Sequence, residues 1–321
     1  MTQERFLERR QASWDKIEGI VNGSAKNIRN NAAWFPRAFR ELTQDLNTAR
    51  AHAFDPVIIE RLNRLVLEGN QLLYGQHSWS VKGLVDFILR TFPQSIRTHW
   101  KGIAAVHLIF YGIMLFTGFL CVRFPEMVYE IMGERQAWNM EQMYDPESDH
   151  FLEPRDVSGD ADMFGFYIYN NISIAFRSFA GGIIAGVGSL IILAFNAVFL
   201  GAAAGHIINS GFAETFFGFI IGHSSFELTA IVLSAFGGLQ LGYRLFITQG
   251  LTRAASMRRA GKTVIPIISG SAIMLVIAAV IEAFWSSQHQ FPMALRLGAG
   301  IAGWVLLFLY FILAGRGKSH D

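Results

Sequence analysis

Two ionisable residues, His223 and Glu227, stand one helical turn apart inside a strongly apolar stretch of the sequence. Residues at positions i and i+4 share one face of a helix, so the two side chains can interact directly. A buried pair of this kind suits proton relay, metal binding, or a general base with its orienting partner. The spacing differs from the HExxH motif of zinc proteases, which places two histidines on one turn. The pair is therefore a candidate for chemistry without a specific catalytic signature.

His206 lies on the preceding apolar segment and is a third candidate ligand. With His223 and Glu227 it would form a His/His/Glu set, which suits zinc with one coordination position left open. The catalytic hypothesis for these residues is a metal-dependent hydrolase embedded in the membrane. The sequence requires no cofactor, and it leaves the presence and identity of a metal open.

Further polar residues share the apolar stretch 164–243. An ionisable group at membrane depth costs about 2.5–3.5 kcal/mol, so such groups should face a protein interior or a water-filled cavity and have partners. Three interpretations stay open: a polar network that holds helices together, a site that handles a ligand or protons, and a metal site. Arg177 and Glu227 can also neutralise each other. The predicted polar membrane cluster comprises Asn170, Asn171, Arg177, Asn196, His206, His223 and Glu227.

Two other polar residues are less promising candidates. Glu282 lies near the outer end of its predicted span, where we expect water to reach it. His107 is interpreted as a hydrogen-bonded residue of helix packing.

The composition is that of a membrane protein. Of 321 residues, 52% are hydrophobic and 16% are charged, too apolar a balance for an ordinary soluble protein. The single cysteine, Cys121, excludes a disulfide framework and a thiolate metal site. Glycines at four-residue spacing, as in Gly182/Gly186 and Gly238/Gly242, allow helices to approach closely in lipid. The first residues lack the apolar run of a secretory signal.

The predicted fold is all-α: a polytopic membrane protein of about six membrane helices, one of them broken or re-entrant, with an N-terminal cytoplasmic helical domain. Apolar residues at helical spacing indicate amphipathic helices near 3–22, 30–52 and 55–75, the last capped by Asp55. The predicted organisation is a cytoplasmic amphipathic domain (1–78), an interfacial helix stopped by Pro93 and membrane entry (79–101), a first span (102–123), an acidic extracytoplasmic loop (124–163), a five-segment membrane core (164–315) and a cytoplasmic tail (316–321).

Loop charges predict the orientation. Residues 124–163 hold 11 acidic residues against Arg135 and Arg155, whereas residues 244–262 hold five basic residues and no acid. Because loops rich in Lys and Arg stay in the cytoplasm, we expect the acidic loop outside and both termini inside. These placements require residues 164–180 to cross the membrane. The expected location is the bacterial inner membrane.

Two segments carry a resemblance to a known family. Residues 169–212 read YNNISIAFRSFAGGIIAGVGSLIILAFNAVFLGAAAGHIINSGF, and residues 222–242 read GHSSFELTAIVLSAFGGLQLG. Together they resemble the stage II sporulation protein M family, over about residues 160–315. The resemblance implies a multi-span inner-membrane protein. In spore formers the namesake is regarded as a membrane anchor for peptidoglycan-degrading partners, with no catalytic activity of its own assigned.

The first functional hypothesis is therefore a non-enzymatic inner-membrane scaffold or assembly protein, linked to envelope or peptidoglycan processes. It would recruit protein partners on the cytoplasmic and outer faces, within a shell of membrane lipids. The alternatives are a transporter or channel-like protein with a polar midplane cavity, and the metal-dependent hydrolase that uses His206, His223 and Glu227. Glycine-rich surfaces allow a homodimer, and nothing indicates nucleic-acid binding.

Overall fold

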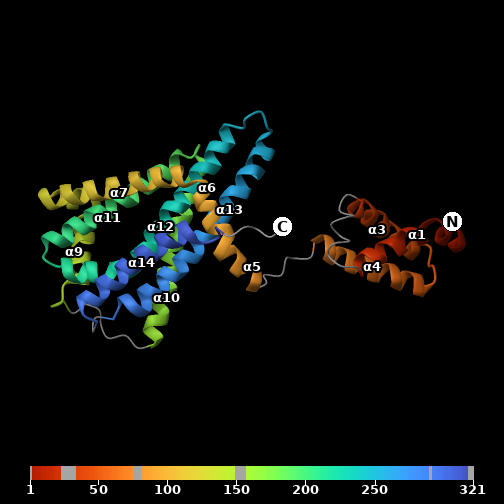
Figure 1. Ribbon diagram of the computed structural model, residues 1–321, viewed down its shortest axis with the longest axis horizontal. Coiled ribbons are helices and arrows are strands. Elements are labelled where there is room, and N and C mark those ends of the chain that lie inside the picture. Colours follow the sequence, from red (N-terminus) through yellow and green to blue (C-terminus); the bar gives the residue numbers. More distant parts are fainter. Residues whose placement is uncertain (1, 23–33, 75–80, 149–156, 289–290, 317–321) are drawn as a thin grey trace. The chain divides into compact units, whose positions relative to one another are not determined.

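The structure is a computed structural model that describes residues 2–22, 34–74, 81–148, 157–288 and 291–316. These residues are almost entirely helical and include no strand, which confirms the all-α prediction. Contacts divide the chain into two compact units, Met1–Gly83 and Leu84–Asp321. Figure 1 labels the main helices of both units.

The N-terminal unit packs three helices, α1 (Gln3–Val21), α3 (Phe35–Ala51) and α4 (Pro56–Tyr74). They correspond to the amphipathic segments that the apolar spacing predicted. Their apolar faces share one core, in which Trp14 and Leu42 are almost completely covered. Full burial of one large apolar side chain stabilises a fold by about 1.5–3 kcal/mol. This unit therefore has a hydrophobic core of its own.

Two carboxylates orient these helices. Asp55 caps α4, because its Oδ1 accepts a hydrogen bond from the Val57 backbone N–H at 2.8 Å. Buried Asp45 of α3 accepts hydrogen bonds from Trp14 Nε1 at 2.9 Å and from Arg10 Nε at 2.8 Å. Both donors belong to α1, so Asp45 fixes how α1 lies against α3.

The helical segment before the first span is longer than predicted. Helix α5 (Val81–Asp86) continues through the π-helical turn η1 (Phe87–Thr91) into α6 (Phe92–Thr98). Pro93 does not stop this segment, and that prediction is wrong. It lies in the first turn of α6, where its fixed φ and missing N–H are tolerated.

Five helices of the second unit are long and apolar enough to cross a membrane. Leu115 and Phe119 are among the apolar side chains on their outer surface, each 66% exposed. Such exposure suits helices that contact lipid. The five are α7 (Trp100–Arg123), α11 (Val187–Asn209), α12 (Ala213–Phe246), α13 (Arg253–Ile281) extended by the π-helical turn η3 (Glu282–Ser286), and α14 (Met293–Leu313).

Helix α10 (Val157–Ala180) is not one of these five. It packs against α11, α12 and α13 and runs unbroken through Asn170 and Asn171. The change of direction comes later, at the 3-10 turn η2 (Gly181–Ile183) and at Gly186, whose φ of 82° begins α11. The predicted broken helix is therefore a continuous helix followed by a tight turn, and a sixth membrane pass stays a prediction.

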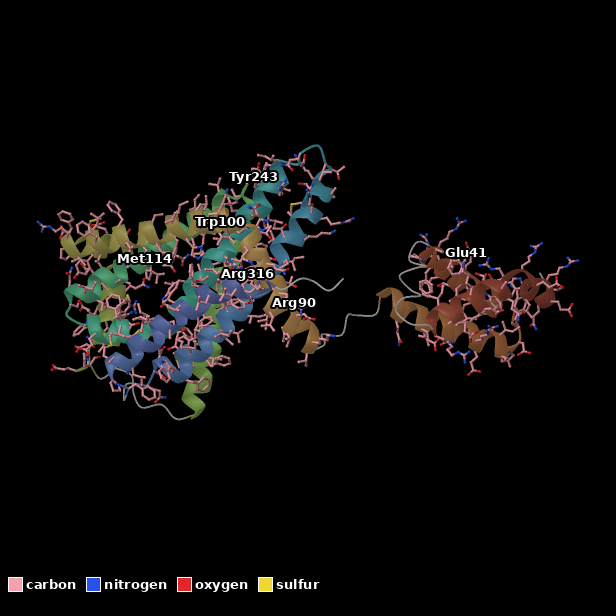
Figure 2. All side chains as sticks on the ribbon, viewed as in Figure 1. Glu41, Arg90, Trp100, Met114, Tyr243 and Arg316 are labelled. Carbon is pink, nitrogen blue, oxygen red and sulfur yellow. The ribbon has the colours of Figure 1, made fainter. Side chains whose placement is uncertain are left out.

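Glycines let helix backbones approach closely in the second unit. A Cβ on Gly242 of α12 would lie 2.1 Å from the Gly182 carbonyl oxygen in the turn after α10. A Cβ on Gly201 of α11 would lie 2.3 Å from the Met114 carbonyl oxygen of α7. Helices α7 and α11 run side by side in Figure 1, and Met114 is labelled in Figure 2. Any larger residue at these glycines would push the helices apart.

Part of the predicted acidic loop 124–163 is folded. Helices α8 (Met127–Met132) and α9 (Glu134–Tyr144) pack on α11, and Val128 and Ala137 are fully buried there. The segment's charge gave no indication of these contacts, because its few apolar residues are scattered among acidic ones. As a result, α9 ends beside the candidate site.

Candidate functional site

The candidate site lies where α10, α12 and η3 meet. Helix α12 carries His223 and Glu227, and the turn η3 carries Glu282. Gly222 lets η3 approach, since a Cβ at this position would lie 3.3 Å from Ser286 Oγ. A π-helical turn such as η3 is an irregular element that occurs frequently at functional sites.

Three ionisable side chains converge at this point. His223, Glu227 and Glu282 each offer one ligand atom, and these atoms all lie within 4.8 Å of one another. The His223 Nε2 atom is 3.7 Å from Glu227 Oε2, so the i,i+4 spacing brings the pair together as expected. His223 and Glu282 are buried, with 4% and 8% of their surfaces exposed.

Neutral side chains hold this trio in place. The His223 Nδ1 atom is hydrogen-bonded to Ser286 Oγ at 3.0 Å, which leaves Nε2 directed toward Glu227. Asn171 Nδ2 donates to Glu282 Oε2 at 3.3 Å. Ser286 lies on η3 and Asn171 lies on α10, so the orientation of the trio is built into the packing of α10, α12 and η3.

In the described part of the chain, the two carboxylates, Glu227 and Glu282, have no lysine or arginine partner. Arg177, which the sequence suggested as a partner for Glu227, is exposed in the last turn of α10. Two ionised carboxylates so close together in apolar surroundings repel each other strongly. A proton or a cation bound between the two carboxylates would remove this repulsion.

A cavity of about 680 Å³ opens in front of the three side chains. Ligand sites in proteins commonly have about 300–1,000 Å³. Most of the wall is apolar and comes from α7, α11, α12 and α14. It includes Leu115 and Phe119, so the cavity wall continues into the lipid-facing surface. Its polar lining includes Asn170, Asn171, His223, Ser224, Glu227 and Glu282.

Tyr144, the last residue of α9, lines the same cavity and is buried. Burial, with a smaller contribution from the nearby Glu282 carboxylate, raises the pKa of the Tyr144 phenol above its ordinary value. The phenol therefore stays protonated and can donate a hydrogen bond. Thr215 Oγ1 donates to the Tyr144 carbonyl oxygen at 2.6 Å, which ties α9 to α12.

Comparison with protein families identifies the second unit, Leu84–Asp321, which we call the membrane unit. The family model for stage II sporulation protein M (SpoIIM) matches residues 107–287, more than half of the chain. The chain belongs to the SpoIIM family. A second model, a domain of unknown function (DUF8413), matches residues 4–75. No match was found among curated proteins or among solved structures.

Membership of the SpoIIM family confirms the resemblance seen in the sequence. Together with the five long apolar helices, it makes the chain a membrane protein. The segment that the SpoIIM model matches contains the whole polar site: Asn171, His223, Glu227, Glu282 and Ser286.

Besides Arg177, two residues of the predicted cluster, Asn196 and His206, lie elsewhere in the membrane unit. The His206 Nε2 atom is 3.0 Å from Glu141 Oε1, close enough for an ion pair when the ring is protonated, although the orientation does not satisfy a hydrogen bond. Asn196 donates to the Ile192 carbonyl oxygen of its own helix at 2.8 Å. The structure thus places Glu282, and not His206, beside His223 and Glu227.

The prediction from the sequence underestimated Glu282. We expected water to reach it, whereas it is buried against α10 and α12. A signal was present, because Glu282 is the single charged residue of 263–286. A lone charge inside an apolar span indicates a functional position. His107 agrees with its structural interpretation, since its Nδ1 is hydrogen-bonded to the Ile103 carbonyl oxygen at 2.9 Å.

Proposed function

We propose that the membrane unit binds an amphiphilic molecule from the bilayer in its cavity, as a transporter or carrier would. The observation that carries this proposal is the position of His223, Glu227 and Glu282 in the wall of a mainly apolar cavity. A polar group at membrane depth must face a protein interior or a cavity, and it commonly marks the path of a substrate or ion. The second functional hypothesis from the sequence was also a transporter or channel-like protein, but with a polar midplane cavity.

The chemistry of the wall defines the kind of ligand. Apolar side chains such as Phe119 and Phe199 suit an acyl chain or another apolar body. The two carboxylates and the histidine in the wall favour a polar group that donates hydrogen bonds, carries a positive charge, or is bridged by a cation. The apolar body and the polar end together describe an amphiphile that enters from the lipid side.

Native mass spectrometry of the detergent-purified full chain tests this function. Ala204 lines the cavity, so the indole of Ala204→Trp should occupy part of it and reduce retention of lipid-sized molecules from the membrane extract. Ile265→Trp is the matched control, because Ile265 is an exposed residue of α13 outside the wall of this cavity. Equal retention by wild type and Ala204→Trp would refute the proposal.

A scaffold role is the second candidate, and a separate observation favours it. The two family models fall on different units: DUF8413 on 4–75 and SpoIIM on 107–287. A module with its own core, attached to a membrane unit, is suited to recruiting a protein partner. Exposed Leu67 on α4 is a suitable position for a photo-crosslinking residue in living cells. If no reproducible protein adduct forms there, or at other exposed positions of the unit, this role is refuted.

The proposed location is the bacterial inner membrane, with both termini in the cytoplasm. The excess of Lys and Arg in residues 244–262 and the acidic character of residues 124–163 support this orientation. It requires α10 to cross the membrane together with the five long apolar helices.

A further inference from the structure

We propose that His223, Glu227 and Glu282 bind one divalent transition-metal ion, zinc by the type of its ligands, with a coordination position open to the cavity. The site lies in the same cavity as the amphiphile proposed above. It does not depend on that ligand, because the three side chains belong to the protein alone.

The ligand atoms are close to the arrangement that zinc requires. Ligands at about 2.0–2.1 Å from a tetrahedral zinc lie about 3.4 Å apart. The distance from His223 Nε2 to Glu227 Oε2 is 3.7 Å, and all three ligand atoms lie within 4.8 Å of one another. Small rotations of the carboxylate groups would bring the three ligand atoms as close together as a bound zinc ion requires. One imidazole and two carboxylates are a ligand set that zinc accepts.

The second observation is an imidazole nitrogen aimed into the site. His223 is almost completely buried, and in the described part of the chain its Nε2 accepts or donates no hydrogen bond. Its other nitrogen is engaged by Ser286 Oγ at 3.0 Å. Metal-bound histidines almost always show this pattern, in which the second nitrogen is held by a neighbouring group that fixes the tautomer.

Glu282 has an orienting partner of the same kind. Asn171 Nδ2 donates to Glu282 Oε2 at 3.3 Å, which leaves the carboxylate's other oxygen available to an ion. Asn171 is itself buried, and its Oδ1 accepts a hydrogen bond from Asn170 Nδ2 at 3.2 Å. Each end of the ligand set is therefore held by a neutral side chain that does not compete for the metal.

The charge balance also favours a divalent cation. Glu227 and Glu282 together carry two negative charges when ionised, and no lysine or arginine in the described segments pairs with them. One divalent ion neutralises both. By contrast, His206 has Glu141 beside it but is not part of any group of three ligands found among the described residues.

Three protein ligands leave a fourth tetrahedral position, and because all three side chains line the cavity this position can open into it. This position would take water or an oxygen atom of a ligand, such as a phosphate or carbonyl oxygen. The chemical class of the cavity's ligand would then be an amphiphile with an oxygen-bearing head.

The test measures metal in the full-length chain, purified in detergent after growth with added zinc and dialysed against metal-free buffer. Plasma mass spectrometry should find one zinc ion, or one other first-row transition-metal ion, per wild-type chain. Glu227→Gln and Glu282→Gln should lose it, whereas His206→Gln should keep it. Ser286→Ala removes only the hydroxyl that holds His223, and it should weaken zinc binding about 10–100-fold in a chelator competition.

The wild-type chain alone decides whether a metal binds, so misfolding of a variant does not leave the proposal untested. Absence of stoichiometric metal from wild type, with no rise in its thermal unfolding temperature when zinc is added, would overturn the proposal in favour of a proton shared by the two carboxylates. Full metal content in both glutamine variants would also overturn it. Neither result depends on whether an amphiphile occupies the cavity, which the Ala204→Trp variant tests separately.

Discussion

Glu227 and Glu282 stand on different helical elements, yet their carboxylate oxygens lie within 4.8 Å of each other inside the membrane unit. The contact joins α12 to the π-helical turn η3. A pair of carboxylates this close is unfavourable for stability unless a positive charge joins them. Because this carboxylate pair lies in the wall of a cavity, it indicates a binding site for a ligand or ion and not a contact that stabilises the fold.

The first prediction separates charge from packing at Glu282. Glu282→Gln removes one negative charge and keeps an oxygen for Asn171, so without metal its thermal unfolding temperature should equal or exceed that of wild type. Glu282→Ala leaves the Asn171 N–H without its acceptor and should lose about 1–3 kcal/mol. The measurement is unfolding in detergent with a chelator present. Equal destabilisation by both variants would show that the carboxylate stabilises the fold.

The second prediction concerns the backbone contact at Gly242. Gly242→Ala places a methyl group where the Gly182 carbonyl oxygen lies, so it should destabilise the membrane unit by about 1–3 kcal/mol or more. Gly112→Ala is the matched control, because Gly112 on α7 has open space around its Cβ position. Alanine there should be neutral or stabilising by about 0.5–1 kcal/mol. Similar unfolding temperatures for the two variants would contradict the close packing.

The third prediction compares two carboxylates that bind Arg10. Asp45 is nearly buried and also accepts the Trp14 N–H, so Asp45→Ala should lose about 1–3 kcal/mol. The Glu41 side chain is 40% exposed and is labelled in Figure 2, and Glu41→Ala should lose less than about 1 kcal/mol. Hydrogen exchange of the α1 amides in the full chain measures both. The reverse order of exchange rates would contradict this account.

The fourth prediction tests the orientation. Gln136 on α9 and Ala254 at the start of α13 are both exposed, whereas the native Cys121 is buried. A maleimide that cannot cross membranes should label Gln136→Cys in intact spheroplasts and should label Ala254→Cys only after lysis. Labelling of both positions from the same side would mean that α10 does not cross the membrane or that the charge rule fails for this chain.

Much of the fold follows from local sequence patterns. Apolar periodicity predicted α1, α3 and α4, and long apolar runs predicted the five membrane helices, because both patterns reflect burial in protein or lipid. Pro93 was misjudged for a local reason, since a proline that stops one helix is equally compatible with the first turn of the next.

The site could be predicted only in part. The i,i+4 pair His223 and Glu227 is local and therefore visible in the sequence. Glu282 joins it because η3 turns its side chain toward α12, and Tyr144 reaches the cavity because α8 and α9 fold back on α11. Both contacts depend on tertiary packing, which the spacing of residues in the sequence does not reveal. The same reason explains why His206, one span away from the pair, pairs with Glu141 instead.

The most direct test of the central claim is whether a molecule from the bilayer can reach the buried carboxylates. Dicyclohexylcarbodiimide is an apolar reagent that modifies protonated carboxyl groups, and peptide mass spectrometry locates the adduct. After chelator treatment, we expect modification of Glu227 or Glu282 in wild type and in Ile265→Trp, and less in Ala204→Trp, whose indole narrows the cavity. No adduct at either glutamate, or an undiminished adduct in Ala204→Trp, would contradict a ligand-accessible site.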